Sequence, residues 1–171
     1  MSDAAAVLAR SRVALGFACA GAVLWLAQPS AQSLTVGGAI AAAGEILRFW
    51  AAGHLEKGRE VTQSGPYGLT RHPLYVGSAT IAAGAAVASA TVAAAAVIVV
   101  YVCVTLGSAI LHEEANMRAA FGDQYDAYLE SRSAPSERAF SLARALKNKE
   151  HRTVLGLVLV AAILAAKAGW K

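Results

Sequence analysis

Residues Pro73–Leu111 read PLYVGSATIAAGAAVASATVAAAAVIVVYVCVTLGSAIL and contain no charged side chain. A single helix of this length would be roughly 58 Å long at about 1.5 Å per residue, which is nearly twice the hydrocarbon thickness of a bilayer, about 30 Å. The stretch therefore has to fold back on itself, and the small residues at 88–91 (Ala-Ser-Ala-Thr) are the best place for a tight turn. We expect a helical hairpin, with one span near Pro73–Ala88 and the next near Val92–Leu111.

The composition of the whole chain indicates an integral membrane protein. Apolar residues make up 57% of the 171 positions and charged residues 15%, whereas soluble domains carry about 25% charged residues. The two cysteines, Cys19 and Cys103, lie in separate apolar blocks and have no zinc-type spacing, so we predict no metal site. The net charge of +4 comes without a basic-aromatic surface pattern, and we predict no nucleic-acid partner.

Three further stretches are apolar enough to be spans: Val13 to about Ala27, Leu34 to about His54, and Thr153–Trp170. With the hairpin they predict an all-α, polytopic membrane helix bundle of about five transmembrane helices and a cytoplasmic cofactor pocket. We expect a single domain, 1–171, with its catalytic core at about 34–130. The remainder, 131–171, reads as a linker at 131–136, an amphipathic interfacial helix at 137–148 and the C-terminal span.

The distribution of lysine and arginine predicts the orientation. Arg10 and Arg12 precede the first span, and Lys57, Arg59 and Arg71 lie between the second and third; seven more basic residues lie between the fourth and fifth. The other two connections carry none. The positive-inside rule then places the amino terminus, the loop before Pro73 and the segment after Leu111 in the cytoplasm. The alanine-rich composition suggests a prokaryotic inner membrane.

Residues 65–77 read GPYGLTRHPLYVG and contain, between apolar blocks, the titratable and aromatic side chains Tyr67, Arg71, His72 and Tyr75. Pro73 is suited to the first position of a helix, so Arg71 and His72 should lie just before its first turn. A helix amino terminus with two cationic neighbours suits an anionic group such as a carboxylate or phosphate. A loop whose Arg71 and His72 merely meet lipid headgroups explains the same residues equally well.

An acidic cluster, Glu113 and Glu114, lies at the other end of the hairpin and should come close to Arg71 and His72 in space. At the carboxyl end of a helix each acidic residue opposes the dipole by a few tenths of a kcal/mol. A positively charged ligand would offset this cost. The alternative is that the two residues form a solvated helix end.

Taken together, Gly65-Pro66-Tyr67, Arg71–Gly77, Glu113-Glu114 and Phe121–Tyr128 resemble the isoprenylcysteine carboxyl methyltransferase and phospholipid methyltransferase family, over about residues 48–128. The resemblance implies an integral membrane methyltransferase that uses S-adenosyl-L-methionine and receives a lipophilic substrate through a membrane-buried channel. It also implies the cofactor contacts, which are Tyr67, His72, Pro73, Leu74, Tyr75 and Glu113, with weaker support for His54, Val61 and Thr62.

The chemistry of the cofactor agrees with these residues. Arg71 and His72 suit its carboxylate, and Glu113 or Glu114 suits its ammonium or a ribose hydroxyl. Tyrosine rings suit a sulfonium or an adenine. We take Arg71, His72 and Glu114 as the candidate catalytic residues. An amine or thiol acceptor needs a base, for which His72, Glu114 or Tyr67 are candidates, whereas a carboxylate acceptor needs none.

The acceptor is left open by the sequence. Residues 109–112 lack the arginine that the prenylcysteine-specific enzymes of this family carry there, so we rank a lipid amine first, a small thiol or carboxylate second and a prenylcysteine third. Membrane lipids are expected partners, and the C-terminal span is a candidate anchor or homodimer contact. The alternative function is a small membrane transporter or binding protein that uses Glu45 and Arg48, one helical turn apart, unless these two only form an intrahelical ion pair.

Overall fold

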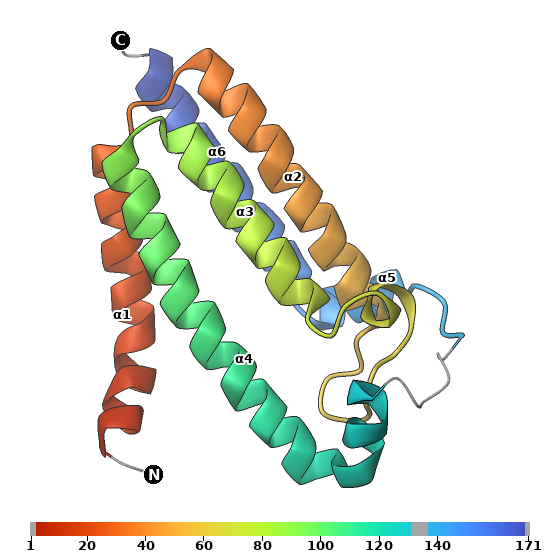
Figure 1. Ribbon diagram of the computed structural model, residues 1–171. Coiled ribbons are helices and arrows are strands. Elements are labelled where there is room, and N and C mark those ends of the chain that lie inside the picture. Colours follow the sequence, from red (N-terminus) through yellow and green to blue (C-terminus); the bar gives the residue numbers. More distant parts are fainter. Residues whose placement is uncertain (1–2, 131–136, 170–171) are drawn as a thin grey trace.

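The computed structural model describes residues 3–130 and 137–169, and these residues contain helices and loops but no strand (Figure 1). The helices are α1 (Asp3–Leu26), α2 (Ala31–His54), α3 (Pro73–Ser89), α4 (Val92–Leu129), α5 (Leu142–Lys147) and α6 (Glu150–Gly169), with a 3₁₀ turn η1 (Gly65–Gly68) between α2 and α3. The predicted all-α class is confirmed. The predicted linker at 131–136 lies outside the described residues.

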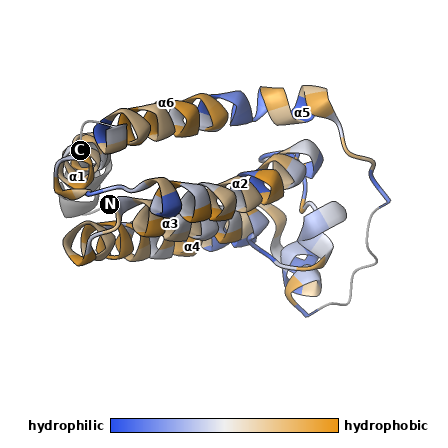
Figure 2. Ribbon diagram, turned by 90° about the horizontal axis from the view of Figure 1, so that it is seen from above, coloured by the Kyte–Doolittle hydropathy of each residue, from blue (hydrophilic) through white to orange (hydrophobic). Residues whose placement is uncertain are grey.

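Three of these helices, α2, α4 and α6, are long and apolar enough to cross a membrane, while α3 and residues 14–26 of α1 are shorter apolar helices. Large apolar side chains such as Trp25, Val100 and Leu155 are exposed, and apolar residues cover most of the helices in Figure 2. Exposed apolar surface on this scale indicates a lipid environment. The chain is therefore described as an integral membrane protein, and the count of five spans stays a prediction.

The helical hairpin turns at residues 88–91, as predicted from the uncharged block Pro73–Leu111. Helix α3 ends at Ser89, Ala90 adopts a left-handed conformation with φ 52°, and the Thr91 hydroxyl caps α4 by accepting a hydrogen bond from the Ala94 N–H. The same turn is tied to the α1–α2 connection, because the Gln28 N–H donates to the Ser89 carbonyl at 2.8 Å. The prediction of a tight turn at 88–91 is confirmed.

The prediction that Glu113 and Glu114 lie at the carboxyl end of the fourth helix is wrong. Helix α4 continues to Leu129, with non-helical angles only at Gly122 (φ 44°, ψ −122°), so Glu113 and Glu114 lie inside a helix and not at its carboxyl end. Residues 112–121 are polar but consist mostly of good helix formers. The change in polarity marks a membrane boundary and not a helix boundary, and the argument from the helix dipole no longer applies to the two glutamates.

Helices α2 and α3 pack more extensively than any other pair in the described chain, through glycines seven residues apart on each helix. Gly37 faces Gly84 and Gly44 faces Gly77. A Cβ atom added to Gly37 would lie 2.5 Å from the Gly84 carbonyl oxygen, and one added to Gly44 would lie 2.7 Å from that of Gly77. The two backbones are in direct contact, as expected for small residues at a membrane helix interface.

The C-terminal segment returns along the bundle. Only Leu142–Lys147 of the interfacial helix expected at 137–148 is helical, and α6 begins at Glu150, three residues before the expected start. Residues 137–141 are not helical, and the extended Ser141 donates its N–H to the Gly53 carbonyl at 3.1 Å at the end of α2. At the far end, the Lys167 ammonium donates to the Leu24 carbonyl at 2.6 Å and caps α1.

Candidate active site

The loop between α2 and α3 is fixed by a glycine that no other residue could replace without strain. Gly65 has φ +58°, and a Cβ atom added there would lie 2.7 Å from the His54 ring. Pro66 follows as a fully buried residue in η1. The Gly-Pro-Tyr-Gly turn is therefore packed directly against the last turn of α2, and it determines where the chain enters α3.

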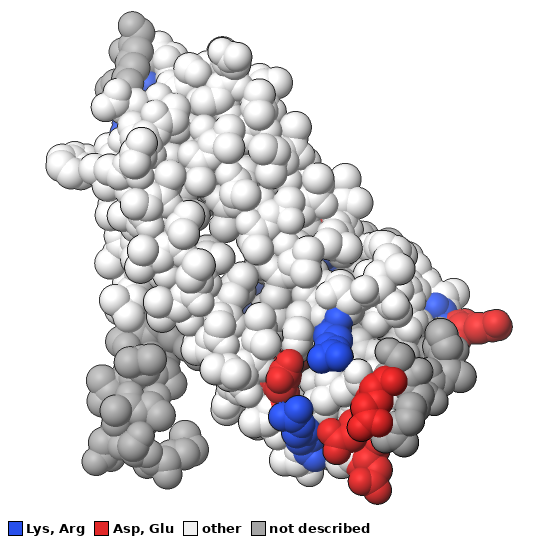
Figure 3. Space-filling view, in the orientation of Figure 1, with Lys and Arg blue, Asp and Glu red and all other residues white. Residues whose placement is uncertain are grey.

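His72 and Glu114 meet where α3 begins. His72 is the N-cap residue of α3 and Pro73 is its first helical residue, as the sequence predicts. The His72 Nε2 atom lies 3.1 Å from Glu114 Oε1, with 19% and 26% of the two side chains exposed. The expectation that the basic and acidic clusters come together is confirmed. Charged side chains of both signs gather at this end of the molecule in Figure 3.

Aromatic rings surround this pair. The Tyr75 ring lies 5.7 Å from the His72 ring, and the Tyr128 hydroxyl donates to the Tyr67 carbonyl at 2.9 Å. Burial, followed by the negative charge of Glu113, raises the pKa of the Tyr67 phenol. Tyr67 therefore stays protonated at neutral pH and can donate a hydrogen bond there but cannot act as a base.

Arg71 closes the site from the side of α4. Its Nη2 atom donates to the Leu129 carbonyl at 2.9 Å, so the guanidinium caps the carboxyl end of that helix. The bend at Gly122 is what turns this last part of α4 back toward the loop, as Figure 1 shows. The bend also brings Tyr125, which is buried, and Tyr128 toward η1.

The three weaker cofactor candidates lie in or beside the loop between α2 and α3. The His54 Nδ1 atom lies 3.0 Å from the Ser64 hydroxyl. The Thr62 hydroxyl accepts from the Glu56 N–H at 3.3 Å, and Val61 and Thr62 are 6% and 5% exposed. These contacts give the three residues a place in shaping the loop, and their contact with a cofactor stays a prediction.

Arg48 ties three helices together beneath the site. Its Nε atom lies 2.7 Å from Glu150 Oε1 in α6, and its Nη1 atom donates to the Leu74 carbonyl at 3.3 Å in the first turn of α3. The Glu45 carboxylate is farther away, at 3.7 Å. The expected intrahelical pair is therefore present, but the short contacts of Arg48 go to other helices.

Sequence reasoning did not assign a role to Glu150, Tyr125 or Tyr128. Glu150 lies 102 residues from Arg48, and no periodicity relates the two. For the two tyrosines a signal was present. Gly122 interrupts an otherwise helical pattern, and an isolated glycine at such a place marks a bend that redirects the residues after it.

The groups gathered here correspond in chemistry to the parts of S-adenosylmethionine. Carboxylates at Glu113 and Glu114 suit an ammonium, His72 and Arg71 suit a carboxylate, and the Tyr75 ring suits a sulfonium or an adenine. The donor set fits this cofactor. Among the residues that the structure describes, no cluster of three or more His, Cys, Asp or Glu side chains could hold a metal ion.

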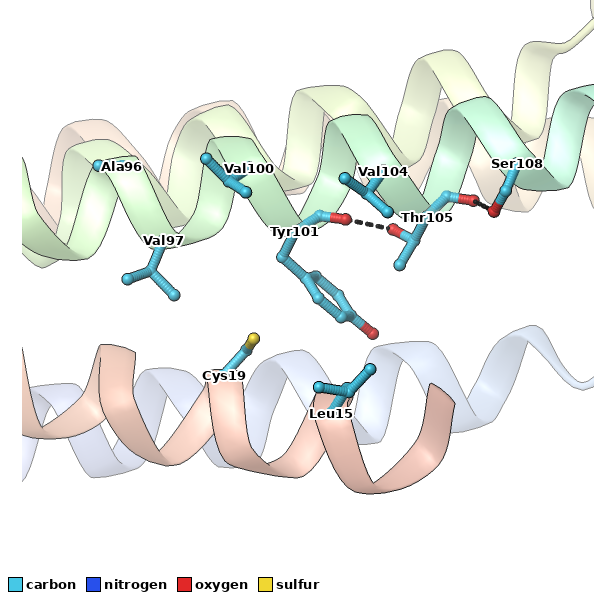
Figure 4. Close-up of a pocket in the computed structure, with 9 residues that line it drawn as sticks. All are labelled: Leu15, Cys19, Ala96, Val97, Val100, Tyr101, Val104, Thr105 and Ser108. Carbon is cyan, nitrogen blue, oxygen red and sulfur yellow. Dashed lines mark hydrogen bonds between the residues drawn. The ribbon is translucent and has the colours of Figure 1, made fainter. Parts of the chain in front are cut away.

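An apolar groove of about 480 Å³ runs between α1 and α4 (Figure 4). Its walls come from Leu15 and Cys19 on one side and from Tyr101, Val104 and neighbouring residues on the other. The hydroxyl of Thr105, which also lines the groove, donates to the Tyr101 carbonyl at 2.7 Å. The groove is accordingly suited to a hydrocarbon chain.

The lining of the groove follows α4 as far as Ser108, on the face of that helix that is turned toward α1. The last residue in its lining is Ser108, which precedes Glu114 by two turns or less on the same helix, about 9 Å at 1.5 Å per residue. A second cavity, of about 310 Å³, lies between α2 and the C-terminal residues Phe140 and Val154. A cofactor cavity at the His72–Glu114 pair itself stays a prediction.

Comparison with protein families finds one match: the model described as Phospholipid methyltransferase covers residues 11–124. That range includes residues 11–26 of α1, the whole of the α2–α3 loop and α4 through the bend at Gly122. No curated protein matches the chain. No solved structure matches it either.

Proposed function

This chain belongs to the phospholipid methyltransferase family, and on that basis we propose that it transfers a methyl group from S-adenosylmethionine to a lipophilic acceptor at the cytoplasmic end of α3 and α4. The observation that carries the proposal is the 3.1 Å contact between His72 Nε2 and Glu114 Oε1. It brings residues of the Arg71–Gly77 and Glu113-Glu114 motifs, 42 positions apart in the chain, into contact. A family with methyltransferase activity and a bundle of apolar helices support a membrane methyltransferase.

Each candidate residue is suited by its charge to one part of the cofactor. When bound, the cofactor supplies an electrophilic methyl group on a cationic sulfur. Arg71, His72 and the start of α3 would hold its carboxylate, and Glu113 would hold its ammonium. The Tyr75 ring would stabilise the positive sulfur. Fixing both partners in line lowers the barrier without any change in the side chains themselves.

An acceptor that carries a proton requires a base, and His72 is placed for that role. Its Nε2–H donates to the Glu114 carboxylate at 3.1 Å, which leaves Nδ1 to take the proton, and the carboxylate stabilises the imidazolium that forms. Tyr67 contributes a hydrogen-bond donor, because its raised pKa keeps the phenol protonated. A carboxylate acceptor would leave this proton transfer unused.

The acceptor class follows from the groove between α1 and α4. Its apolar walls suit an acyl or prenyl tail, and its lining ends at Ser108, six residues before Glu114 on α4. A lipid amine remains the first-ranked acceptor, ahead of a small thiol or carboxylate and of a prenylcysteine. The rival transporter function would require Arg48 to exchange partners, whereas its contacts to Glu150 and Leu74 hold it in place.

Calorimetry with S-adenosylhomocysteine tests the proposal. The purified parent chain in detergent should bind it saturably, and His72→Ala and Glu114→Ala should each weaken binding by about tenfold or more. The matched control is His151→Ala, an exposed histidine in α6. A parent chain that does not bind, or two site variants that bind as tightly as the control, would remove the methyltransferase assignment.

A further inference from the structure

Glu150 is a buried carboxylate at the start of α6, and it lies outside the family match at residues 11–124. It is 3% exposed, and its Oε1 atom accepts a hydrogen bond from Arg48 Nε at 2.7 Å. A buried charge needs a partner of opposite charge, and here the partner is a guanidinium on another helix. The first residue of α6 is therefore fixed to α2.

Arg48 extends this connection to α3. Its Nη1 atom donates to the Leu74 carbonyl at 3.3 Å and to the Ser78 hydroxyl. The Ser78 hydroxyl in turn donates to the Leu74 carbonyl at 2.8 Å. Because the guanidinium is planar and rigid, the bond from Nε to Glu150 also sets the direction in which Nη1 points. The position of Glu150 thus determines how Arg48 holds the first turn of α3.

Gly77 gives Arg48 its path to α3. A Cβ atom added at Gly77 would lie 2.5 Å from Arg48 Cγ, so the aliphatic part of the arginine lies directly across the glycine. Gly77 is the last residue of the Arg71–Gly77 motif, and Ser78 follows it. The motif therefore contains both the residues proposed to hold the cofactor and the place where α3 receives Arg48.

A single peptide bond connects Arg48 to the proposed cofactor residues. The carbonyl that Arg48 holds belongs to the peptide bond between Leu74 and Tyr75, and the N–H of that same peptide bond donates to the His72 carbonyl at 3.0 Å. A shift of this peptide bond would move the His72 backbone and the Tyr75 ring together. Misplacement by about 1 Å is enough to weaken catalysis substantially.

We propose, on the basis of the methyl transfer proposed above, that Glu150 is a positioning residue. Acting through Arg48, it fixes the Leu74–Tyr75 peptide bond and so sets how tightly the start of α3 holds S-adenosylmethionine. The C-terminal segment then contributes to cofactor affinity without touching the cofactor. A segment that served only as an anchor would need α6 to be attached to the bundle, but not to the first turn of α3.

Lys167 offers a matched comparison at the other end of α6. Its ammonium donates to the Leu24 carbonyl at 2.6 Å and to the Trp25 carbonyl at 2.8 Å, so it also attaches α6 to the bundle. Both of these bonds end on α1 and not on α3. Removal of the Lys167 charge therefore weakens the attachment of α6 and leaves the contacts of Arg48 in place.

Calorimetry with S-adenosylhomocysteine on Glu150→Gln and Lys167→Gln separates the two roles of α6. Glutamine keeps an acceptor oxygen for Arg48 Nε, and Glu45 at 3.7 Å remains as a counter-charge, so the variant is expected to fold. Both variants should melt at a lower temperature than the parent chain. Only Glu150→Gln should weaken binding, by roughly three- to tenfold.

Hydrogen exchange in the absence of ligand provides a readout that does not depend on binding. Amide exchange at residues 74–78 should rise by about threefold or more in Glu150→Gln and stay at the parental rate in Lys167→Gln. An equal rise in both variants would mean that α6 stabilises the bundle as a whole, and would overturn the inference.

Ser78→Ala is the second variant, because it removes the hydroxyl that Arg48 bonds and suits a helix interior. It should weaken binding by about two- to fivefold. Combined with Glu150→Gln it should lose less than the product of the two single losses, because both changes act on one connection.

The outcomes distinguish this inference from the proposed function. A parent chain that does not bind S-adenosylhomocysteine would remove both. If the parent binds, parental affinity in a folded Glu150→Gln variant would remove the inference alone. Should Glu150→Gln fail to fold, parental affinity and parental exchange at residues 74–78 in Ser78→Ala would remove it in the same way.

Discussion

Helix α3 packs mainly against α2 and α4, and these two interfaces are built in opposite ways. Against α2 it presents Gly77 and Gly84, and the backbones touch. Against α4 it presents side chains, and the contact that closes the polar end is His72 to Glu114. The comparison teaches that one face of α3 fixes its position while the other leaves room for chemistry. The glycine interface is a scaffold, and the side-chain interface is the proposed site.

The largest effect should be on the rate of methyl transfer, and it should come from the interface between α3 and α4. His72→Ala removes the proposed base and part of the cofactor contact, so methyl transfer to an amine or thiol acceptor should fall by roughly 10²- to 10⁴-fold. The measurement is mass spectrometry of a membrane lipid extract incubated with the protein and methyl-labelled S-adenosylmethionine. A His72→Ala variant that labels the same lipid at the parental rate would show that the side-chain face of α3 is not the site.

The scaffold face should respond in stability and not in chemistry. Gly37→Ala forces a methyl group to within 2.5 Å of the Gly84 carbonyl oxygen and should destabilise the bundle by about 1–3 kcal/mol. Gly38→Ala is the matched control, because a Cβ atom there meets nothing within 4 Å. Thermal unfolding in detergent should separate the two, with Gly38→Ala neutral or slightly stabilising. Equal melting temperatures would contradict the backbone contact.

The bend in α4 at Gly122 places Tyr128 against the α2–α3 loop. A substitution at this bend should give an intermediate effect. Gly122 has φ 44°, ψ −122°, so Gly122→Ala should strain the backbone by about 1–3 kcal/mol. The strain should also loosen the Tyr128 hydroxyl from the Tyr67 carbonyl. Hydrogen exchange at residues 65–72 should then rise. Ala119→Gly is the control within the same helix, and a similar rise in both variants would separate the exchange from the bend.

The smallest effect concerns alkaline pH. Burial raises the pKa of Tyr67 above the value of about 10 that it has when unfolded, so the proton is held more tightly in the folded state. Its contribution to stability is present below pH 10 and declines as the pH rises above it, by about 1.4 kcal/mol per unit at most until the folded pKa is reached. Tyr67→Phe should reduce the loss of melting temperature between pH 9 and 11, and an unchanged loss would contradict the burial of the phenol.

The hairpin and its meeting ends could be predicted from the sequence because chain length fixes them. An uncharged block too long for one crossing has to turn, and the turn determines that Arg71 and His72 come near Glu113 and Glu114. The extension of α4 to Leu129 could not be predicted in this way. Polarity changes where the membrane ends, but helix propensity continues past that boundary.

The remaining parts of the site depend on contacts with no sequence signal. Glu150 reaches Arg48 because α6 returns along α2, and nothing in the spacing of the two residues predicts this. Phe140 lines the cavity of about 310 Å³ beside Glu45 and packs against Gly53. This contact requires residues 137–141 not to be helical. Amphipathic spacing predicted a helix over those residues, and tertiary packing overrode it.

The most direct test of the central claim is a double-mutant cycle for S-adenosylhomocysteine binding with His72→Ala, Glu114→Ala and the two combined. If the pair acts as one site, the combined variant should bind more tightly than the sum of the single losses predicts, by about 0.5–3 kcal/mol. Strictly additive losses, or full binding in the combined variant, would contradict the claim that the start of α3 and Glu114 of α4 form the methyl-transfer site.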